Sequence, residues 1–278
     1  MRNWLRKHFP LDRKVKLLQA FCYLGLITGM IVFWSWSWFL IGLCAGWFLW
    51  LSGTSSLHKW SAHRMFTPKN RLCKWILLFA STVTALGSNV SWAATHRKHH
   101  KYADHEGDPH SPNLDGATVW RSIRLWFYYF PTYNINPRTI KDLTVCKDHK
   151  WFHKNYFRIN IIWMLALLVI SPYALIYLYF LPVIYVFSGI SYITVLAHNP
   201  WLHKKIKGYV NFETDDLTFN SKLMSVILPG EGNHNNHHAN PATAKSAMKQ
   251  PDWDLGFWWI RLMGKNINTT EYQQTYHA

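Results

Sequence analysis

Two long blocks of the sequence contain no Asp, Glu, Lys, Arg or His, and they constrain the fold more than any other feature. They cover residues 17–57 and 159–197, each about 40 residues long. As helix, each block would be about 60 Å long, which is enough for two crossings of a hydrocarbon layer roughly 30 Å thick. Ser35-Trp36-Ser37 and Ser171-Pro172 interrupt the two blocks and favour turns there. The sequence therefore predicts an all-α integral membrane protein with four transmembrane helices in two hairpins.

The charged side chains are distributed unevenly along the chain. All 30 Lys and Arg residues lie outside the apolar blocks, and they outnumber the 14 acidic residues to give a formal net charge of +16. Six basic residues precede the first block: Arg2, Arg6, Lys7, Arg13, Lys14 and Lys16. By the positive-inside rule, they predict that both termini and every charged segment face the cytoplasm. We assign the basic charge to topology, to membrane lipid headgroups and to a protein partner, and expect no nucleic-acid partner.

These features divide the chain into five expected parts. They are a basic cytoplasmic N-terminal segment (1–16), a first transmembrane hairpin (17–57), a cytoplasmic and interfacial region (58–158), a second hairpin (159–197) and a cytoplasmic C-terminal region (198–278).

Three segments outside the hairpins carry apolar patterns of their own. Residues 72–95 are expected to form one helix that lies in, or dips into, the cytoplasmic interface, because a full crossing would separate the histidines on its two sides. Residues 120–133 mix arginines with aromatic side chains and predict a second interfacial helix. The aromatic residues of 253–263 recur near helical spacing and predict an amphipathic helix that packs back on the domain or the membrane.

Histidines recur in a repeated pattern outside the apolar blocks. If their segment is helical, His96, His99 and His100 share one sector of about 100°, so three imidazoles would point into the same space. Residues 234–238 repeat this spacing with His234, His237 and His238. A face of this kind is suited to binding a metal ion.

Three further histidines stand where the apolar blocks end. His58 and His63 follow the first block, and their spacing of five separates them by about 140° on a continuous α-helix, so they would straddle a helix end or reach two metals. His198 follows the second block directly. Nine histidines are thus expected on one side of the membrane: His58, His63, His96, His99, His100, His198, His234, His237 and His238. Nine imidazoles indicate two metals, and neutral imidazole suits iron, copper, nickel or zinc.

The order and spacing of the three histidine boxes, His58 to His63, His96 to His100 and His234 to His238, resemble those of the membrane fatty acyl desaturases, in particular the acyl-CoA (stearoyl-CoA, delta-9) branch. The likeness extends from about His58 to Met263. It includes Asp108-Pro109-His110, Gly230-Glu231-Gly232 and Asp252-Trp253-Asp254-Leu255.

This resemblance implies an oxidoreductase that uses O2 and two electrons at a diiron centre (Fe2+/Fe3+). The expected reaction inserts a cis double bond, at the delta-9 position, into a saturated fatty acyl chain. The nine histidines would be the iron ligands, and Trp92 would line the bend of the acyl tunnel. The chain contains no His-Pro-Gly-Gly segment of a fused cytochrome b5, so a separate electron donor of the ferredoxin or cytochrome b5 type is expected.

Two positions depart from the family pattern. Thr194 stands where the family usually has an Asn that holds a metal-bound water, and its hydroxyl is a candidate for a water-mediated metal contact. Leu86 and Gly87 stand where the acyl-CoA enzymes tend to have polar residues that meet the substrate head group. The acyl carrier is therefore left open among CoA, a lipid and a carrier protein.

Supporting roles follow from the chemistry of such a site. Metal-binding histidines need their second ring nitrogen anchored, and the candidate anchors are Glu106, Asp108 and Glu231. A tunnel that enters the first hairpin would end against side chains such as Leu40, Cys44 and Trp47.

Two other functions are compatible with parts of the pattern. A related diiron hydroxylase or alkane monooxygenase would share the three boxes but add oxygen to the substrate. A membrane metal transporter would also use cytoplasmic histidines, but it should carry polar or ionisable residues inside its spans, and both apolar blocks lack ionisable side chains of the acidic, basic and histidine types.

Overall fold

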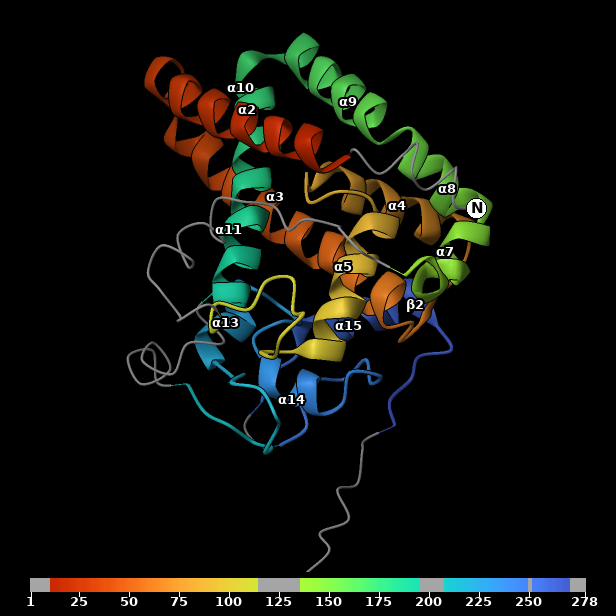
Figure 1. The fold of residues 1–278 in the computed structure, drawn as a ribbon. Helices are drawn as coiled ribbons and strands as arrows, with labels where there is room; N and C mark the ends of the chain where they lie inside the picture. The colour runs from red at the N-terminus through yellow and green to blue at the C-terminus, as the bar shows by residue number, and fades with distance from the viewer. Residues whose placement is uncertain (1–10, 115–135, 196–207, 250–251, 271–278) are drawn as a thin grey trace, which may run out of the picture.

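The computed structural model describes residues 11–114, 136–195, 208–249 and 252–270, and nearly all of its regular structure is helical (Figure 1). The first hairpin consists of α2 (Leu11–Val32) and α3 (Trp36–Thr54). Ser35 has extended backbone angles and its side chain accepts a hydrogen bond from the backbone N of Trp38, so it caps α3. The predicted turn therefore lies at the expected place. Without a further break, α3 continues into the π-helix η1 (Ser55–Ala62).

The second hairpin is built from α9 (Tyr156–Ile170), α10 (Pro172–Leu175), the π-helix η3 (Ile176–Phe180) and α11 (Leu181–Val195). Ser171 caps α10, and Pro172 occupies the first helical position, where its missing N–H costs nothing. The Tyr177 hydroxyl donates to Phe33 O at 2.9 Å and accepts from Ser35 N at 3.2 Å. The turns of both hairpins therefore lie together at one end of the bundle.

In the part of the chain that the structure describes, three stretches are long and apolar enough to cross a membrane, namely Lys14–Val32, Trp36–Ala62 and Pro172–Ile193. The fourth expected span corresponds to α9, which is apolar but has only 15 residues, or about 22 Å of helix. Within the described residues, the structure thus supports a helical membrane protein with three helices of sufficient length, and it does not confirm the fourth expected span. The outward faces of these helices carry exposed apolar side chains, such as Ile31, Leu40 and Val169, as expected for contact with lipid.

Small residues allow the long helices to approach closely. A Cβ atom on Gly42 would lie 2.6 Å from Tyr177 O, and one on Gly189 would lie 2.4 Å from the ring of Trp50. Because lipid supplies no hydrophobic force between helices, such close backbone packing is a main source of helix association in membranes.

Between the hairpins, the predicted single helix over 72–95 is wrong, because the structure has two helices there, α4 (Arg71–Val83) and α5 (Asn89–Tyr102). Ala85 and Gly87 have φ values of 57° and 95°, which end the first helix and turn the chain. Ser88 then caps α5 by accepting a hydrogen bond from Ser91 N. This break directs α5, which carries box 2, along the end of η1.

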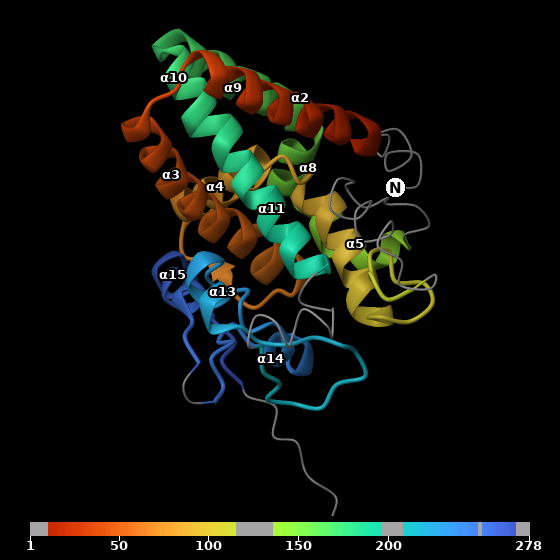
Figure 2. The same ribbon diagram turned by 90° about the vertical axis from the view of Figure 1, so that its left-hand side faces the viewer.

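The remaining helices are short. They are η2 (Pro137–Ile140), α7 (Lys141–Val145), α8 (Lys147–Lys154), α13 (Lys222–Ile227), α14 (His234–Ala239) and α15 (Leu255–Met263). The helix α15 confirms the predicted amphipathic helix near the C-terminus, and it is followed by β2 (Gly264–Lys265), which pairs antiparallel with β1 (Thr67–Pro68). Figure 2 shows α13, α14 and α15 together at the end of the bundle opposite the α10 turn. The second predicted interfacial helix, over 120–133, lies outside the described residues.

Candidate metal centre

Box 1 lies at the C-terminal end of η1, with His58 inside this helix and His63 at its C-cap position. In a π-helix each N–H bonds to the carbonyl five residues earlier, so residues five apart lie on the same side of the helix. The backbone N of His63 donates to His58 O at 3.1 Å, and the two imidazole centroids are 4.9 Å apart. The separation of about 140° expected for an α-helix therefore does not apply, and both side chains point into one space.

Box 2 lies on α5, and its histidines face two directions. His96 Nε2 is 2.9 Å from His63 Nε2, and the ring centroid of His100 is 4.4 Å from that of His63. One turn before His96, Trp92 stacks on the His96 ring at 4.5 Å with an interplanar angle of 19°. His99 points to a neighbouring position beside Asp108.

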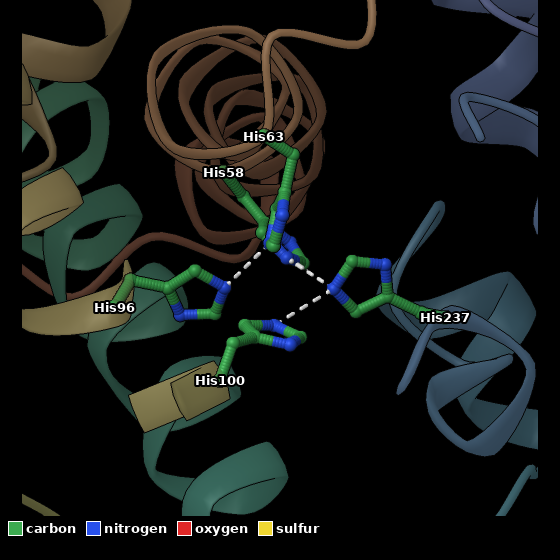
Figure 3. Close-up of side chains that lie close together, drawn as sticks. All are labelled: His58, His63, His96, His100 and His237. Atoms are coloured by element: carbon green, nitrogen blue, oxygen red, sulfur yellow. Dashed lines mark hydrogen bonds between the residues drawn. The ribbon is translucent and has the colours of Figure 1, made fainter. Parts of the chain in front are cut away.

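Box 3 brings a third element to the same point through α14. His237 Nε2 lies 2.8 Å from His58 Nε2 and 3.1 Å from His100 Nε2. Figure 3 shows these side chains converging from η1, α5 and α14. The ligand nitrogens of His58, His63, His96, His100 and His237 all lie within 4.8 Å of one another. We call these five residues the histidine cluster.

Three further predicted ligands lie beside the histidine cluster. The ring of His238 is 4.5 Å from the rings of His100 and His234 and 5.3 Å from that of His99. His99 also forms a second group of closely spaced potential ligands with Asp108 and His110. The structure thus brings together all eight predicted ligands that it describes, while His198 lies outside the described residues.

Carboxylates hold the outer ring nitrogens of three of these histidines. Glu231 Oε1 is 2.7 Å from His58 Nδ1, Asp108 Oδ2 is 2.9 Å from His99 Nδ1, and Asp216 Oδ2 is 2.7 Å from His238 Nδ1. A carboxylate on Nδ1 fixes the orientation of the ring and leaves Nε2 as the metal-binding atom. Asp108 and Glu231 were candidate anchors from the sequence. Asp216 was not, because it lies 22 residues before His238 and no local pattern connects them.

The electrostatic environment favours neutral imidazoles in the cluster. Burial lowers the pKa of His63, His96, His100 and His237 well below the usual value, and the neighbouring histidines lower it further. Neutral imidazole is the form that binds a metal ion. Burial raises the pKa of Asp108, but hydrogen bonds from His99 and from backbone N–H groups outweigh it and leave that pKa well below the usual range.

Burial has the larger effect at Glu231. It raises the pKa of Glu231 to about 7, although the positive charge of Lys59 opposes the rise. Both anchoring carboxylates are buried, but they differ because Asp108 also accepts hydrogen bonds from the backbone N–H groups of Asp104 and His110.

The other sequence candidates lie in different places. Glu106 is exposed, and the side chain of Thr194 is outside what the structure describes. On α3, Leu40 is 59% exposed and Cys44 is exposed, so these two side chains face away from the bundle. Trp47 donates from Nε1 to Val226 O at 2.9 Å. An interior tunnel would therefore end against side chains other than Leu40 and Cys44.

The donor set fits a metal centre of imidazole type. Several buried neutral imidazoles with converging nitrogens and carboxylate-held outer nitrogens are the arrangement that first-row transition metals require. We predict that Asp108→Asn lowers metal affinity by about 10- to 100-fold, because the charge that orients His99 is lost. Metal retained against a chelator would measure the change, with Asp148→Asn, whose carboxylate pairs with Lys74 instead, as the control. Equal retention in both variants would contradict a role for Asp108 in holding the ligand.

Curated proteins from several organisms are similar to this chain over most of its length. The sn-1 stearoyl-lipid 9-desaturase of Anabaena variabilis is 27% identical over 264 residues, covering 90% of this chain and 91% of that protein. Delta-9 acyl-lipid desaturase 2 of Arabidopsis thaliana is 29% identical and covers 93% and 81%. The hex-5-enoyl-[acyl-carrier protein] acetylenase of Moorena producens (strain JHB) is also 29% identical and covers 93% and 84%.

The family model described as fatty acid desaturase matches residues 33–263. This match begins at the turn of the first hairpin, spans all three histidine boxes and ends with α15. The chain therefore belongs to the fatty acid desaturase family.

Proposed function

We propose that this protein is a membrane oxidoreductase that inserts a cis double bond at the delta-9 position of a saturated acyl chain carried by a membrane lipid. The observation that carries the proposal is the histidine cluster, in which three sequence-distant boxes converge within 4.8 Å at one end of an apolar helix bundle. The names of the relatives in Anabaena and Arabidopsis support both the position and the lipid carrier.

The surroundings of the α4–α5 turn also favour a lipid carrier over acyl-CoA. Leu86 is 1% exposed, and Gly87 N donates to the hydroxyl of the buried Tyr156 at 3.1 Å. Neither position offers a polar side chain to a soluble head group. Acyl-lipid, acyl-CoA and acyl-carrier-protein substrates should be compared directly, since the acetylenase relative is named for a carrier-protein substrate.

We propose two iron ions as the metals. The five residues of the histidine cluster would bind one side of the iron pair. The other side would be bound by His99, His234 and His238, together with His198. When bound, the irons supply activation of O2 with two electrons from a separate donor. The side chains of this chain hold and orient the ligands, and Trp92, stacked on His96, would shape the acyl path beside them. One methylene resembles the next, so selection of a carbon pair has to come from such positioning.

We place the histidine cluster and both termini on the cytoplasmic side, with the hairpin turns at Ser35 and Ser171 on the other. The charge-free blocks and the basic N-terminal segment support this orientation.

Product analysis by mass spectrometry tests the reaction. Purified protein, supplied with iron, O2, a reductant and a saturated acyl substrate, should give a product lighter by two hydrogens. A product heavier by one oxygen would instead identify a hydroxylase. If protein that binds iron formed neither product, that result would contradict the proposed function.

The electron donor should dock on basic side chains near the boxes. The sequence places five basic side chains near the boxes. Of these, Lys59 is 2% exposed and the side chain of Arg97 is 13% exposed, so neither is available to contact a docked protein. Arg64, Lys98 and Lys101 remain, of which Arg64 and Lys101 are exposed and Lys98 is half-buried. We propose an acidic ferredoxin or cytochrome b5 as the partner, because opposite charges speed such encounters by about 10- to 10³-fold at low salt.

We therefore predict that raising salt from about 0.05 to 0.5 M slows donor-supported turnover at subsaturating donor, because the screening length shortens severalfold. Turnover driven by a small chemical reductant should not change. Lys98→Ala combined with Lys101→Ala should weaken the salt effect, whereas Lys265→Ala, on β2, should not. The same salt dependence for both electron sources would remove the docking proposal.

A further inference from the structure

The C-terminal end of η1 has two backbone carbonyls that accept no backbone hydrogen bond within the described chain. The preceding carbonyls do accept backbone hydrogen bonds: His58 O from His63 N, Trp60 O from Arg64 N and Lys59 O from Met65 N. The carbonyls of Ser61 and Ala62 are instead occupied by one side chain. Arg97 donates from Nη2 to Ser61 O at 2.6 Å and from Nε to Ala62 O at 2.8 Å. A single guanidinium thus completes the helix end that carries box 1.

Arg97 is itself part of box 2, directly after His96 on α5. Its side chain is 13% exposed, so it lies inside the protein and does not belong to the solvated basic surface. The planar guanidinium presents its N–H groups in a fixed fork, which matches two adjacent carbonyls. A lysine ammonium at the same place would be a flexible point charge and could not hold both carbonyls in this geometry.

Asp142 holds the guanidinium from its other side. Its two oxygens lie 2.8 Å from Arg97 Nη1 and 2.9 Å from Nη2. Arg97 Nη1 also donates to the carbonyl of Thr139. Although burial raises the pKa of Asp142, hydrogen bonds from Arg97 and Arg64 lower it to about 2, so the carboxylate is anionic at neutral pH. The helices α5 and α7 and the end of η1 are therefore fastened together at Arg97.

We propose that Arg97 is a positioning residue that fixes the last turn of η1 as a π-helix and so aims His58 and His63 at the same metal. Helix-end carbonyls that lose their partner are satisfied by rewinding the last turn or by water. Rewinding to α-helical geometry would separate His58 and His63 by about 140° and take one of them out of the histidine cluster. The inference rests on the proposed metal centre for its consequence, but the hydrogen bonds that carry it do not depend on a metal.

The test compares Arg97→Lys with Arg64→Lys. Arg64 shares the Asp142 carboxylate, with Nε 2.8 Å from Oδ2. Within the described chain its side chain does not bond to the Ser61 or Ala62 carbonyl, so it is a matched control. In metal-free protein, hydrogen exchange of the amides of residues 63–65 should be about 10- to 100-fold faster in Arg97→Lys, because bonds to a charged group are lost. Fe2+ titration of the same preparations should show an affinity lower by about 10- to 100-fold. Arg64→Lys should leave both quantities close to those of the unaltered chain.

The outcomes separate this inference from the proposed function. Equal exchange and equal Fe2+ affinity in the two variants would overturn the role of Arg97. If the unaltered protein binds no Fe2+, the proposed metal centre fails, and the exchange rates alone then decide whether Arg97 holds η1. Should Arg97→Lys not fold, Asp142→Asn keeps the guanidinium but removes its anchor, and unchanged exchange of residues 63–65 in that variant would equally overturn the proposal.

Discussion

Replacing His237 or His99 by Ala is expected to abolish activity, with a loss of more than about 10³-fold in turnover, since metal ligands act as a unit. His237 is the member of the histidine cluster that joins box 3 to box 1 and to box 2. His99 belongs to the second group of potential ligands, with Asp108 and His110, and it lies near the ring of His238. Because each change disables the same centre, the double variant should lose no more activity than either single variant. Turnover and iron content per chain are the measurements.

A nearby histidine provides the control for these two variants. His105 is exposed, and its Nδ1 is 2.7 Å from Ala103 O, close to its own position in the chain. His105→Ala should therefore keep near-normal turnover and iron content. All variants should unfold at similar temperatures in detergent, because the membrane helices are untouched. Near-normal turnover in His237→Ala or His99→Ala would show that the side chain concerned is not a ligand.

Gly232→Ala is expected to be among the most damaging single-methyl additions, with a cost to stability above about 3 kcal/mol. A Cβ atom at this position would lie 2.1 Å from the backbone N of Ser225 and 2.4 Å from its Cα. No rotation of a side chain can relieve contact with backbone atoms, so α13 or the start of α14 would have to move. Gly232 lies two residues before His234, and Gly232 O accepts from Ser221 N at 2.8 Å, so the movement would also displace box 3.

Thermal unfolding in detergent and iron content would measure this effect together. Lys222→Ala, an exposed change on the neighbouring α13, should alter neither. Ser225→Gly combined with Gly232→Ala should not restore stability, because the clash involves backbone rather than the Ser225 hydroxyl. A Gly232→Ala protein with an unchanged melting temperature would show that the segment around box 3 can shift without cost.

Much of the fold could be predicted because it depends on strong local signals. The absence of charge over 17–57 and 159–197 identified the apolar helices, and Ser35 and Ser171 marked their turns through ordinary capping. The spacing of boxes 2 and 3 predicted helical faces of histidine, which α5 and α14 provide. The aromatic pattern before Met263 predicted α15 in the same way.

Other features could not be predicted because they arise from contacts between distant segments. The π-helical geometry of box 1 depends on Arg97, which is 36 residues from Ser61. Leu40 and Cys44 were assigned inward because α3 is apolar all round, so its sequence does not distinguish the lipid-facing side from the core. The positive φ of Ala85, which divides the expected helix over 72–95, is unusual for a residue other than glycine, and no local sequence rule indicates it.

The distance along the chain between the boxes determines when the centre can exist during synthesis. His58 and His237 are 179 residues apart in sequence although their Nε2 atoms are 2.8 Å apart. At about 5–20 residues per second, a ribosome would deliver box 3 roughly 9–36 s after box 1. Throughout that interval the first hairpin would be in the membrane, while the polar side chains around η1 would lack their contacts with α14. Metal loading of the proposed centre would therefore have to follow synthesis of box 3, and a nascent chain released before residue 234 would have the apolar helices but not this centre.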